Sequence, residues 1–412
     1  MSIHSELNKN LKFNFTVNLL DGAFFGLGFG FASLVTVLPL FVANLTDSAM
    51  LIGVIPAVHN MGWMLPQLLT ARSVSRMKRF KPAVMIWTTQ ERLPFLVLGI
   101  LSLFIADMNK TAALVITFAL LIWQGLSAGM TANPWQNMIG KIIPSNMRGT
   151  FFGSQSAAAN LLGSGGALAA GFFLETKGFP RGFTWAFFSC AASMAISMVA
   201  LASTREPERA EEPLPTELVS FWGNVRHILH TDRDFRWFII GRFMFQFGTM
   251  ASAFYTVYAV NKLGMNTITA GAMTSVLFIV QVASNLLFGW IADRIGRLPV
   301  LRIGAASAVI ATLIAYLAPS ANWFFAVMIF SGAALSTFWT IGIVFSLEFG
   351  SDSDRPTYVG LSNTLVAPAA ILAPLLGGWI ADTFSYQHTF LASFVFALIV
   401  LAIMLKFVKS PP

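Results

Sequence analysis

The chain contains twelve stretches of predominantly apolar residues, each close to the length of about 20 residues that a helix needs to cross a membrane. Hydrophobic residues make up 56% of the 412 residues and charged residues 11%, whereas soluble domains carry about 25% charged residues. Because so few charges cannot form a water-exposed surface, we expect lipid to cover most of the molecule. The sequence therefore predicts an all-α membrane protein with twelve transmembrane helices. The approximate spans are residues 13–43, 50–70, 83–106, 111–140, 150–174, 183–203, 237–260, 268–291, 299–317, 323–347, 358–381 and 389–407.

Residues 204–236 form the longest polar interval and divide the spans into two sets of six. The interval opens with acidic residues and two prolines, Pro213 and Pro215, and continues with apolar residues at helical spacing. We expect a flexible acidic segment followed by an amphipathic helix at the membrane surface. The predicted parts are an N-terminal segment (1–12), a six-helix bundle (13–203), the linker (204–236) and a second six-helix bundle (237–408).

The basic residues are distributed unequally between the two sides of the predicted membrane. Twenty of the 26 Lys and Arg residues fall on one side, four fall on the other, and Arg92 and Arg242 lie inside spans. Because loops rich in Lys and Arg remain in the cytoplasm, this bias predicts a multi-pass protein of the plasma (inner) membrane with both termini cytoplasmic. The net charge of +8 follows from this topology, and nucleic acid is not an expected partner.

Short sequence repeats relate spans that face opposite ways. The second spans of the two halves align without gaps, so that Gly53 falls on Gly271. The sequence Gly-Trp-Ile-Ala-Asp occurs at 289–293 and again at 378–382, and residues 171–175 have the same form, a glycine followed four residues later by an acid. Similar segments three spans apart are typical of inverted-topology repeats.

Residues 289–297 read Gly-Trp-Ile-Ala-Asp-Arg-Ile-Gly-Arg and stand between spans 8 and 9. This sequence resembles the signature loop of the major facilitator superfamily. The span count, the long central loop and the symmetry of six spans plus six extend the resemblance over the whole chain. The resemblance implies two pseudo-symmetric six-helix bundles built from inverted 3+3 repeats, and secondary transport by alternating access.

Two segments depart from the superfamily pattern. In the loop between spans 2 and 3, Ala71, Ser75 and Lys78 stand where a glycine, an aspartate and a second glycine are expected. In span 4, Leu121 stands where the family has an arginine. The resemblance therefore assigns no subfamily.

The signature loop is a candidate conformational gate. The resemblance places it against the start of span 5, where Asp293 would pair with Arg148 and interact with the helix dipole, with a stabilisation of about 1–2 kcal/mol. A pair that forms in one conformation and breaks in the other biases the equilibrium between them. The alternative is ordinary helix capping combined with topology. The residues assigned to the gate are Gly289, Asp293, Arg294, Gly296, Arg297 and Arg148.

Four ionisable residues lie inside predicted spans, where they are costly and therefore indicate function. They are Asp21, Glu91, Arg92 and Arg242. Asp21 continues a polar stripe of Asn14 and Asn18 at helical spacing, and Arg242 begins one with Gln246 and Thr249. The resemblance implies that spans 1, 4, 7 and 10 line a central cavity. We expect the two stripes to face each other there, with a lining completed by Gln124, Ser336, Trp339 and Thr340.

These residues have functional and structural interpretations. Asp21 would carry a proton or bind a cationic part of the solute, and Arg242 would bind an anionic part. Alternatively, the charges pair with one another and hold the bundle together. An Arg92–Asp21 bridge is one such pair, with Glu91 as a proton site or a second partner. We expect His59 to make helix-packing hydrogen bonds. The candidate substrate- and proton-binding residues are Asp21, Asn18, Glu91, Arg92, Gln124, Arg242, Gln246 and Trp339.

The sequence contains no catalytic or phosphate-binding motif, and its one cysteine, Cys190, excludes thiolate metal clusters. We therefore expect neither enzymatic activity nor a cofactor or metal. The lead hypothesis is efflux of a small, amphipathic organic solute, coupled to protons, by a chain that works as a monomer in the lipid bilayer. The alternatives are proton-coupled uptake of a metabolite, sugar or organic anion, and a non-transporting sensor or lipid-handling protein on the same fold.

Overall fold

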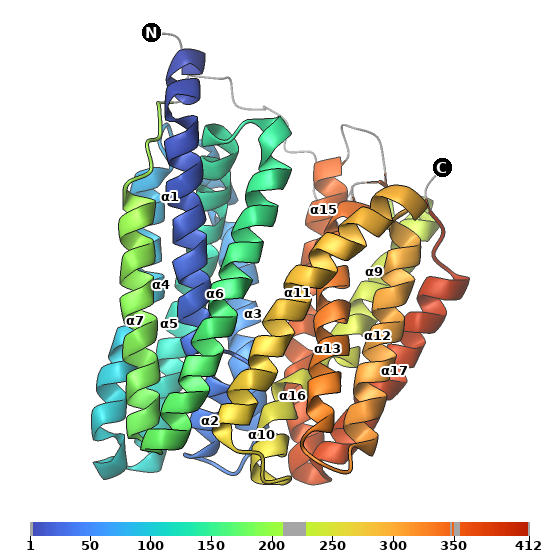
Figure 1. The fold of residues 1–412 in the computed structure, drawn as a ribbon. Helices are drawn as coiled ribbons and strands as arrows, with labels where there is room; N and C mark the ends of the chain where they lie inside the picture. Colours follow the sequence, from blue (N-terminus) through green and yellow to red (C-terminus); the bar gives the residue numbers. More distant parts are fainter. Residues whose placement is uncertain (1–2, 209–227, 347, 350–354, 411–412) are drawn as a thin grey trace. The chain divides into compact units, whose positions relative to one another are not determined.

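A computed structural model describes residues 3–208, 228–346, 348–349 and 355–410 of the chain (Figure 1). All regular structure in this described part is helical, as predicted. The helices of the first half are α1 (Ile3–Phe31), α2 (Val37–Ala43), α3 (Ala49–Ser75), α4 (Lys81–Phe104), η1 (Ile105–Asp107), α5 (Lys110–Ile142), η2 (Ser145–Met147), α6 (Arg148–Lys177) and α7 (Arg181–Ala202). Those of the second half are α9 (Arg233–Gly248), η3 (Met250–Ala253), α10 (Tyr255–Asn261), α11 (Thr267–Ile295), α12 (Arg297–Leu317), α13 (Trp323–Ser336), η4 (Thr337–Ile341), α14 (Gly342–Ser346), α15 (Arg355–Thr364), α16 (Ala367–Thr383) and α17 (Tyr386–Lys406).

Each of the twelve predicted spans corresponds to a helix or to a run of consecutive helices. Ten helical segments among the described residues are long and apolar enough to cross a membrane. The other two predicted spans are the first and the seventh. The first is α1 followed by α2, and α1 carries several polar residues. The seventh is divided into α9, η3 and α10, so neither of its α-helices has the required length by itself.

The chain divides into two compact units. Unit 1 comprises residues 1–46, 58–215 and 266–275, and unit 2 comprises residues 47–57, 216–265 and 276–412. Two helices pass from one unit into the other. The first nine residues of α3 belong to unit 2 and the rest of that helix to unit 1, and the first nine residues of α11 belong to unit 1 and the rest to unit 2.

In unit 1, α1 packs against α6 and α7, and α4 packs against α5 and α7. Glycines bring α1 and α6 into backbone contact, because a Cβ atom at Gly166 would lie only 2.6 Å from the carbonyl oxygen of Leu27. Without a hydrophobic driving force inside a membrane, such close contact between small residues is a main source of attraction between helices. The glycine-rich sequence of the first and fifth spans therefore positions α1, which carries Asp21, against its neighbours.

In unit 2, α12 packs against α13 and α17, and α9 packs against α16 and α17. Its core is built largely from aromatic rings. Phe235 lies 4.6 Å from Tyr358 and Phe238 lies 5.0 Å from Phe345, measured between ring centroids in edge-to-face arrangements. Such pairs are preferred over face-to-face stacking because the ring edges are positive and the faces negative. This packing fixes α9 against the later spans.

The tenth and eleventh spans are interrupted. Between α13 and α14 the chain forms the π-helical segment η4, and α15 ends at Thr364 before α16 begins at Ala367. Interruptions of this kind are tolerated at membrane depth only where protein or a polar cavity satisfies the backbone. The predicted amphipathic helix of the linker falls mainly on residues 209–227, outside the described residues. Residues 228–231 are helical.

Candidate functional site

The buried charges of unit 1 form a bridge between three helices. Asp21 on α1 accepts a hydrogen bond of 2.9 Å from Arg92 Nη2 on α4 and one of 2.6 Å from Ser197 Oγ on α7. The same Arg92 nitrogen lies 2.8 Å from Ser197 Oγ, and its guanidinium lies over the Phe25 ring at 5.5 Å. Asp21 is 5% exposed and Arg92 is 7% exposed. The structure therefore contains the Arg92–Asp21 bridge that the sequence suggested.

Glu91 and Arg92 are neighbours in sequence but contact different helices. Successive residues of an α-helix point about 100° apart. Arg92 therefore points to α1 and α7, while the Glu91 carboxyl lies near Thr131 on α5, whose hydroxyl donates to the Ser127 carbonyl at 2.9 Å. Arg92 Nε and Nη1 have no hydrogen-bond partner among the described residues. Unit 1 thus holds a second buried acid that is not consumed by the bridge.

The two asparagines of the stripe on α1 point to the end of α7. Asn18 Nδ2 donates to Thr204 Oγ1 at 3.0 Å, and Asn14 exchanges two hydrogen bonds with the backbone of Arg205, at 2.8 and 2.9 Å. The backbone groups that follow α7 need partners, and Asn14 supplies them for Arg205. This part of the stripe therefore faces its own unit, which differs from the expected position across a cavity from Arg242.

Gln124 on α5 is buried beside His59 on α3. Gln124 is 3% exposed, and neither its Nε2 atom nor His59 Nδ1 has a hydrogen-bond partner among the described residues. The packing hydrogen bonds expected for His59 stay a prediction. An amide donor left without a partner at membrane depth is unfavourable, so Gln124 stays a candidate for solute contact.

In unit 2, Arg242 on α9 is 4% exposed and donates from Nη1 to the Ser362 side chain on α15 at 3.0 Å and to its carbonyl at 3.3 Å. Gln246, one turn further along α9, is half-buried. Trp339 lies in η4 and is 39% exposed. Thr340 donates to Asn285 at 2.9 Å. The candidate residues of unit 2 are therefore distributed over α9 and the interrupted tenth and eleventh spans.

The signature loop joins α11 to α12 by a turn that requires glycine. Gly296 has φ of 89°, a left-handed conformation that other residues adopt at a cost. The Arg294 guanidinium stacks over the Trp290 ring at 3.6 Å, and Arg297 forms an ion pair with Glu348. Asp293 is exposed. The sequence interpretation missed Glu348, because it follows the tenth span in sequence and nothing local relates it to this loop.

Arg148 begins α6 and donates to the carbonyl groups of Gly140 and Ile143 at the end of α5. These contacts lie within unit 1. A pair between Arg148 and Asp293 would join the two units, so it stays a prediction.

Comparison with known proteins now defines the family. The model of the Major Facilitator Superfamily matches residues 92–273 and, again, residues 238–412. The chain belongs to the Major Facilitator Superfamily. The match confirms the superfamily resemblance that the sequence of residues 289–297 indicated.

Curated relatives within the superfamily match a limited part of the chain. "Multidrug resistance protein MdtL" of Escherichia coli K12 is 29% identical over 135 residues, which are 32% of this chain and 34% of the relative. MdtL of Shigella boydii matches to the same extent. The chain thus spans about a third of the length of the curated relatives it matches.

Solved structures of superfamily transporters share the fold over nearly the whole chain. The nucleoside transporter NupG has a TM-score of 0.72 at 14% identity, and the match covers 96% of this chain and 98% of that one. A D-xylose-proton symporter has a TM-score of 0.73 at 18% identity, covering 96% of this chain and 98% of that chain. At such identities the likeness concerns the fold alone.

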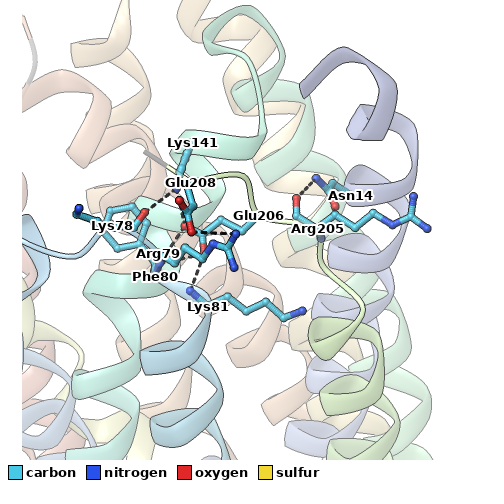
Figure 2. A network of polar contacts seen from close by, with 9 residues as sticks. All are labelled: Asn14, Lys78, Arg79, Phe80, Lys81, Lys141, Arg205, Glu206 and Glu208. Carbon is cyan, nitrogen blue, oxygen red and sulfur yellow. Dashed lines mark hydrogen bonds and ion pairs between the residues drawn. The ribbon is translucent and has the colours of Figure 1, made fainter. Parts of the chain in front are cut away.

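The superfamily loop between the second and third spans, which lacks its aspartate here, is held by an acid from elsewhere (Figure 2). Glu206 accepts hydrogen bonds from the backbone N–H groups of Phe80 at 2.9 Å and Lys81 at 2.7 Å, and forms an ion pair of 2.9 Å with Lys141. Its side chain is 1% exposed. Glu206 therefore caps the start of α4, where Phe80 provides no side-chain cap.

The sequence interpretation placed Glu206 in a flexible acidic segment. Residues up to 208 are instead fixed to unit 1: Arg205 bonds to Asn14, and Glu208 pairs with Arg79 at 3.2 Å. One signal was available, because four basic residues near the start of α4 and the end of α5 have no acid close to them in sequence (Lys78, Arg79, Lys81 and Lys141). The first acid after the sixth span is Glu206.

Proposed function

We propose that this chain is a proton-coupled secondary transporter that exports a small, amphipathic organic solute by alternating access, as a monomer with both termini in the cytoplasm. The observation that carries the proposal is the buried bridge of Asp21, Arg92 and Ser197. At membrane depth, a carboxylate and a guanidinium find few other charged or water partners. Their pairing therefore responds strongly to any change in the charge of either group.

The bridge provides a chemical route from proton binding to helix movement. When Asp21 takes up a proton, its ion pair with Arg92 is lost, and the guanidinium is left with neutral acceptors such as the Ser197 hydroxyl. Three helices meet at this point, α1, α4 and α7, so the change alters contacts among all of them. Glu91, the neighbour of Arg92 on α4 and itself 5% exposed, is a second candidate proton site.

Two observations support export of an organic solute. The curated relatives are multidrug resistance proteins, and the match covers about a third of their length. The chain also contains 39 Phe and 18 Met residues, side chains that adapt to apolar and aromatic ligands. The Lys and Arg distribution supports cytoplasmic termini.

Solute flux in proteoliposomes tests this proposal. Purified protein in sealed vesicles is supplied with an imposed pH gradient and a panel of radiolabelled neutral, cationic and anionic organic solutes. We expect at least one amphipathic solute to accumulate against its gradient, and a protonophore to abolish that accumulation. Protein-free vesicles are the control. If the folded protein moves no solute under either sign of the gradient, the non-transporting alternatives are favoured and the proposal is wrong.

A further inference from the structure

Arg242 is a buried cation to which the described part of unit 2 offers no acid. Its two hydrogen bonds go to the carbonyl and hydroxyl of Ser362, which are neutral acceptors. None of the acidic residues after position 237 lies inside a predicted span; they are Asp293, Glu348, Asp352, Asp354 and Asp382. The described part of unit 2 therefore supplies no counter-charge to Arg242 inside the predicted spans. A cation at membrane depth without a counter-charge is strongly unfavourable.

The acid that was expected to face Arg242 is already engaged. Asp21 pairs with Arg92 and accepts a second hydrogen bond from Ser197, all within unit 1. The charges of this bridge balance each other. Glu91, the other buried acid of unit 1, lies outside this bridge. The positive charge of Arg242 is therefore left without an acidic partner among the described residues of its own unit.

The backbone around Arg242 is interrupted on two spans. A Cβ atom at Gly342, directly after η4, would lie 3.8 Å from Arg242 Nε. Ser362 lies in the last turn of α15, shortly before the break that precedes α16. π-Helical segments occur frequently at functional sites, and transporters of other folds bind anionic groups at interrupted helices. Arg242 therefore stands where two independent features indicate a ligand site.

We propose that Arg242 binds an anionic group, such as a carboxylate or sulfonate, of the transported solute. This inference rests on the proposed transport function and narrows its substrate to amphipathic organic anions. An exposed aromatic side chain is available for the apolar part of such a solute, because Trp339 on η4 is 39% exposed.

Three probes test the inference. They share one naphthalene scaffold and carry a carboxylate, a carboxamide or an aminomethyl group. Binding to the purified full chain is measured by calorimetry, and flux is measured in proteoliposomes. We expect the wild type to prefer the carboxylate over the carboxamide by about 10- to 100-fold, the range for hydrogen bonds to a charged group. Arg242→Gln should abolish this preference and Arg242→Lys should retain part of it. Arg302→Gln is the matched control, because Arg302 donates to the Met404 carbonyl and has no place in this site.

The outcomes separate this inference from the proposed function. Flux of the aminomethyl or carboxamide probe at least equal to that of the carboxylate would leave transport standing and overturn the anion site. Retention of the full carboxylate preference in Arg242→Gln would overturn it as well. If none of the three probes binds to protein with a cooperative thermal unfolding transition, the inference is also wrong.

A different observation concerns the two repeats of glycine and acid at the ends of α6 and α16. Asp382 accepts hydrogen bonds at the start of α3, from the backbone of Ala49 at 2.5 Å and Met50 at 2.9 Å and from the Ser48 hydroxyl at 2.7 Å. Four residues earlier, a Cβ atom at Gly378 would lie 2.6 Å from Met50 Cα. The glycine thus permits close contact and the acid caps the helix that is contacted.

Glu175 makes the same arrangement at the start of α11. It accepts hydrogen bonds from the backbone of Thr267 at 2.8 Å and from its hydroxyl at 2.7 Å. A Cβ atom at Gly171 would lie 2.6 Å from the Thr267 carbonyl and 3.0 Å from Gly271 Cα. The third copy of the pattern is different, because Gly289 has open space around it and Asp293 is exposed.

We infer that Asp382 and Glu175 are paired clasps that hold one conformation of the transport cycle. Each clasp lies inside one unit, and the helix it caps, α3 or α11, continues into the other unit. Loss of these hydrogen bonds would therefore release the start of a helix that belongs to both units. This second inference rests on alternating access but not on the identity of the solute.

Spin-label distances test the clasps. Labels are placed at Lys110→Cys on unit 1 and Lys262→Cys on unit 2, and the native Cys190, with no exposed surface, needs no replacement. We expect the double variant Asp382→Asn with Glu175→Gln to change the ratio of the distance populations by roughly tenfold, from the loss of two helix caps. Asp107→Asn, an exposed acid on η1, is the control and should leave the ratio unchanged. An unchanged ratio in the double variant, with or without a lower thermal unfolding temperature, would show that the acids only cap helices locally.

Discussion

Asp21→Asn is expected to lower the stability of the protein by about 3–5 kcal/mol and to abolish coupling to protons. Asparagine has nearly the same shape and can still accept a hydrogen bond from Ser197, but it removes the charge opposite Arg92. The guanidinium then remains 7% exposed, with Nε and Nη1 already without partners among the described residues. Removing one partner of a buried pair is far more costly than removing both, because the remaining charge has no compensation.

The double variant Asp21→Asn with Arg92→Gln provides the matched control. It should regain most of the lost stability, because neither charge remains, and it should still fail to couple solute flux to protons. Thermal unfolding in detergent measures the first effect, and exchange of labelled solute across vesicles measures whether solute still binds and moves. If the single and double variants were equally destabilised, the charge pairing would not be the source of the stability.

Glu206→Ala is expected to destabilise the protein by about 2–4 kcal/mol. The change removes the acceptor for the backbone N–H groups of Phe80 and Lys81 and the counter-charge of Lys141, which is 14% exposed. Because the Glu206 side chain is only 1% exposed, water cannot fully replace the carboxylate among the partners drawn in Figure 2. We also expect the start of α4 to exchange its amide hydrogens faster.

Glu208→Ala is the matched control for this prediction. Glu208 is two residues away and also pairs with a basic residue, Arg79, but their side chains are 69% and 54% exposed. Exposed pairs contribute about 0–1 kcal/mol. Unfolding curves of the two variants should therefore differ clearly. Equal effects of Glu206→Ala and Glu208→Ala would contradict the anchoring role of Glu206.

Much of the fold could be predicted from sequence because membrane insertion depends on composition along the chain. The spans and the Arg92–Asp21 bridge follow from which residues a lipid environment tolerates. The interruptions of the seventh, tenth and eleventh spans could not be predicted, because apolar residues continue through them. They depend on tertiary packing around Arg242 and the aromatic core of unit 2.

The candidate site was harder to predict, because it depends on how each helix is rotated about its axis. Spacing placed Asn14, Asn18 and Asp21 on one face of α1, but it could not show that this face meets the end of α7. Contacts between residues distant in sequence could also not be predicted from the sequence pattern. Glu206 with the start of α4, and Glu348 with Arg297, join segments that share no local pattern.

The most direct test of the central claim is proton movement driven by solute alone. Vesicles containing the protein and a pH-sensitive dye are loaded with a transported solute and diluted into solute-free buffer at equal pH. For coupled export through Asp21, we expect the lumen to acidify in the wild type and to stay at constant pH in Asp21→Asn, even though labelled solute still exchanges. Loss of solute from wild-type vesicles without acidification would contradict the claim.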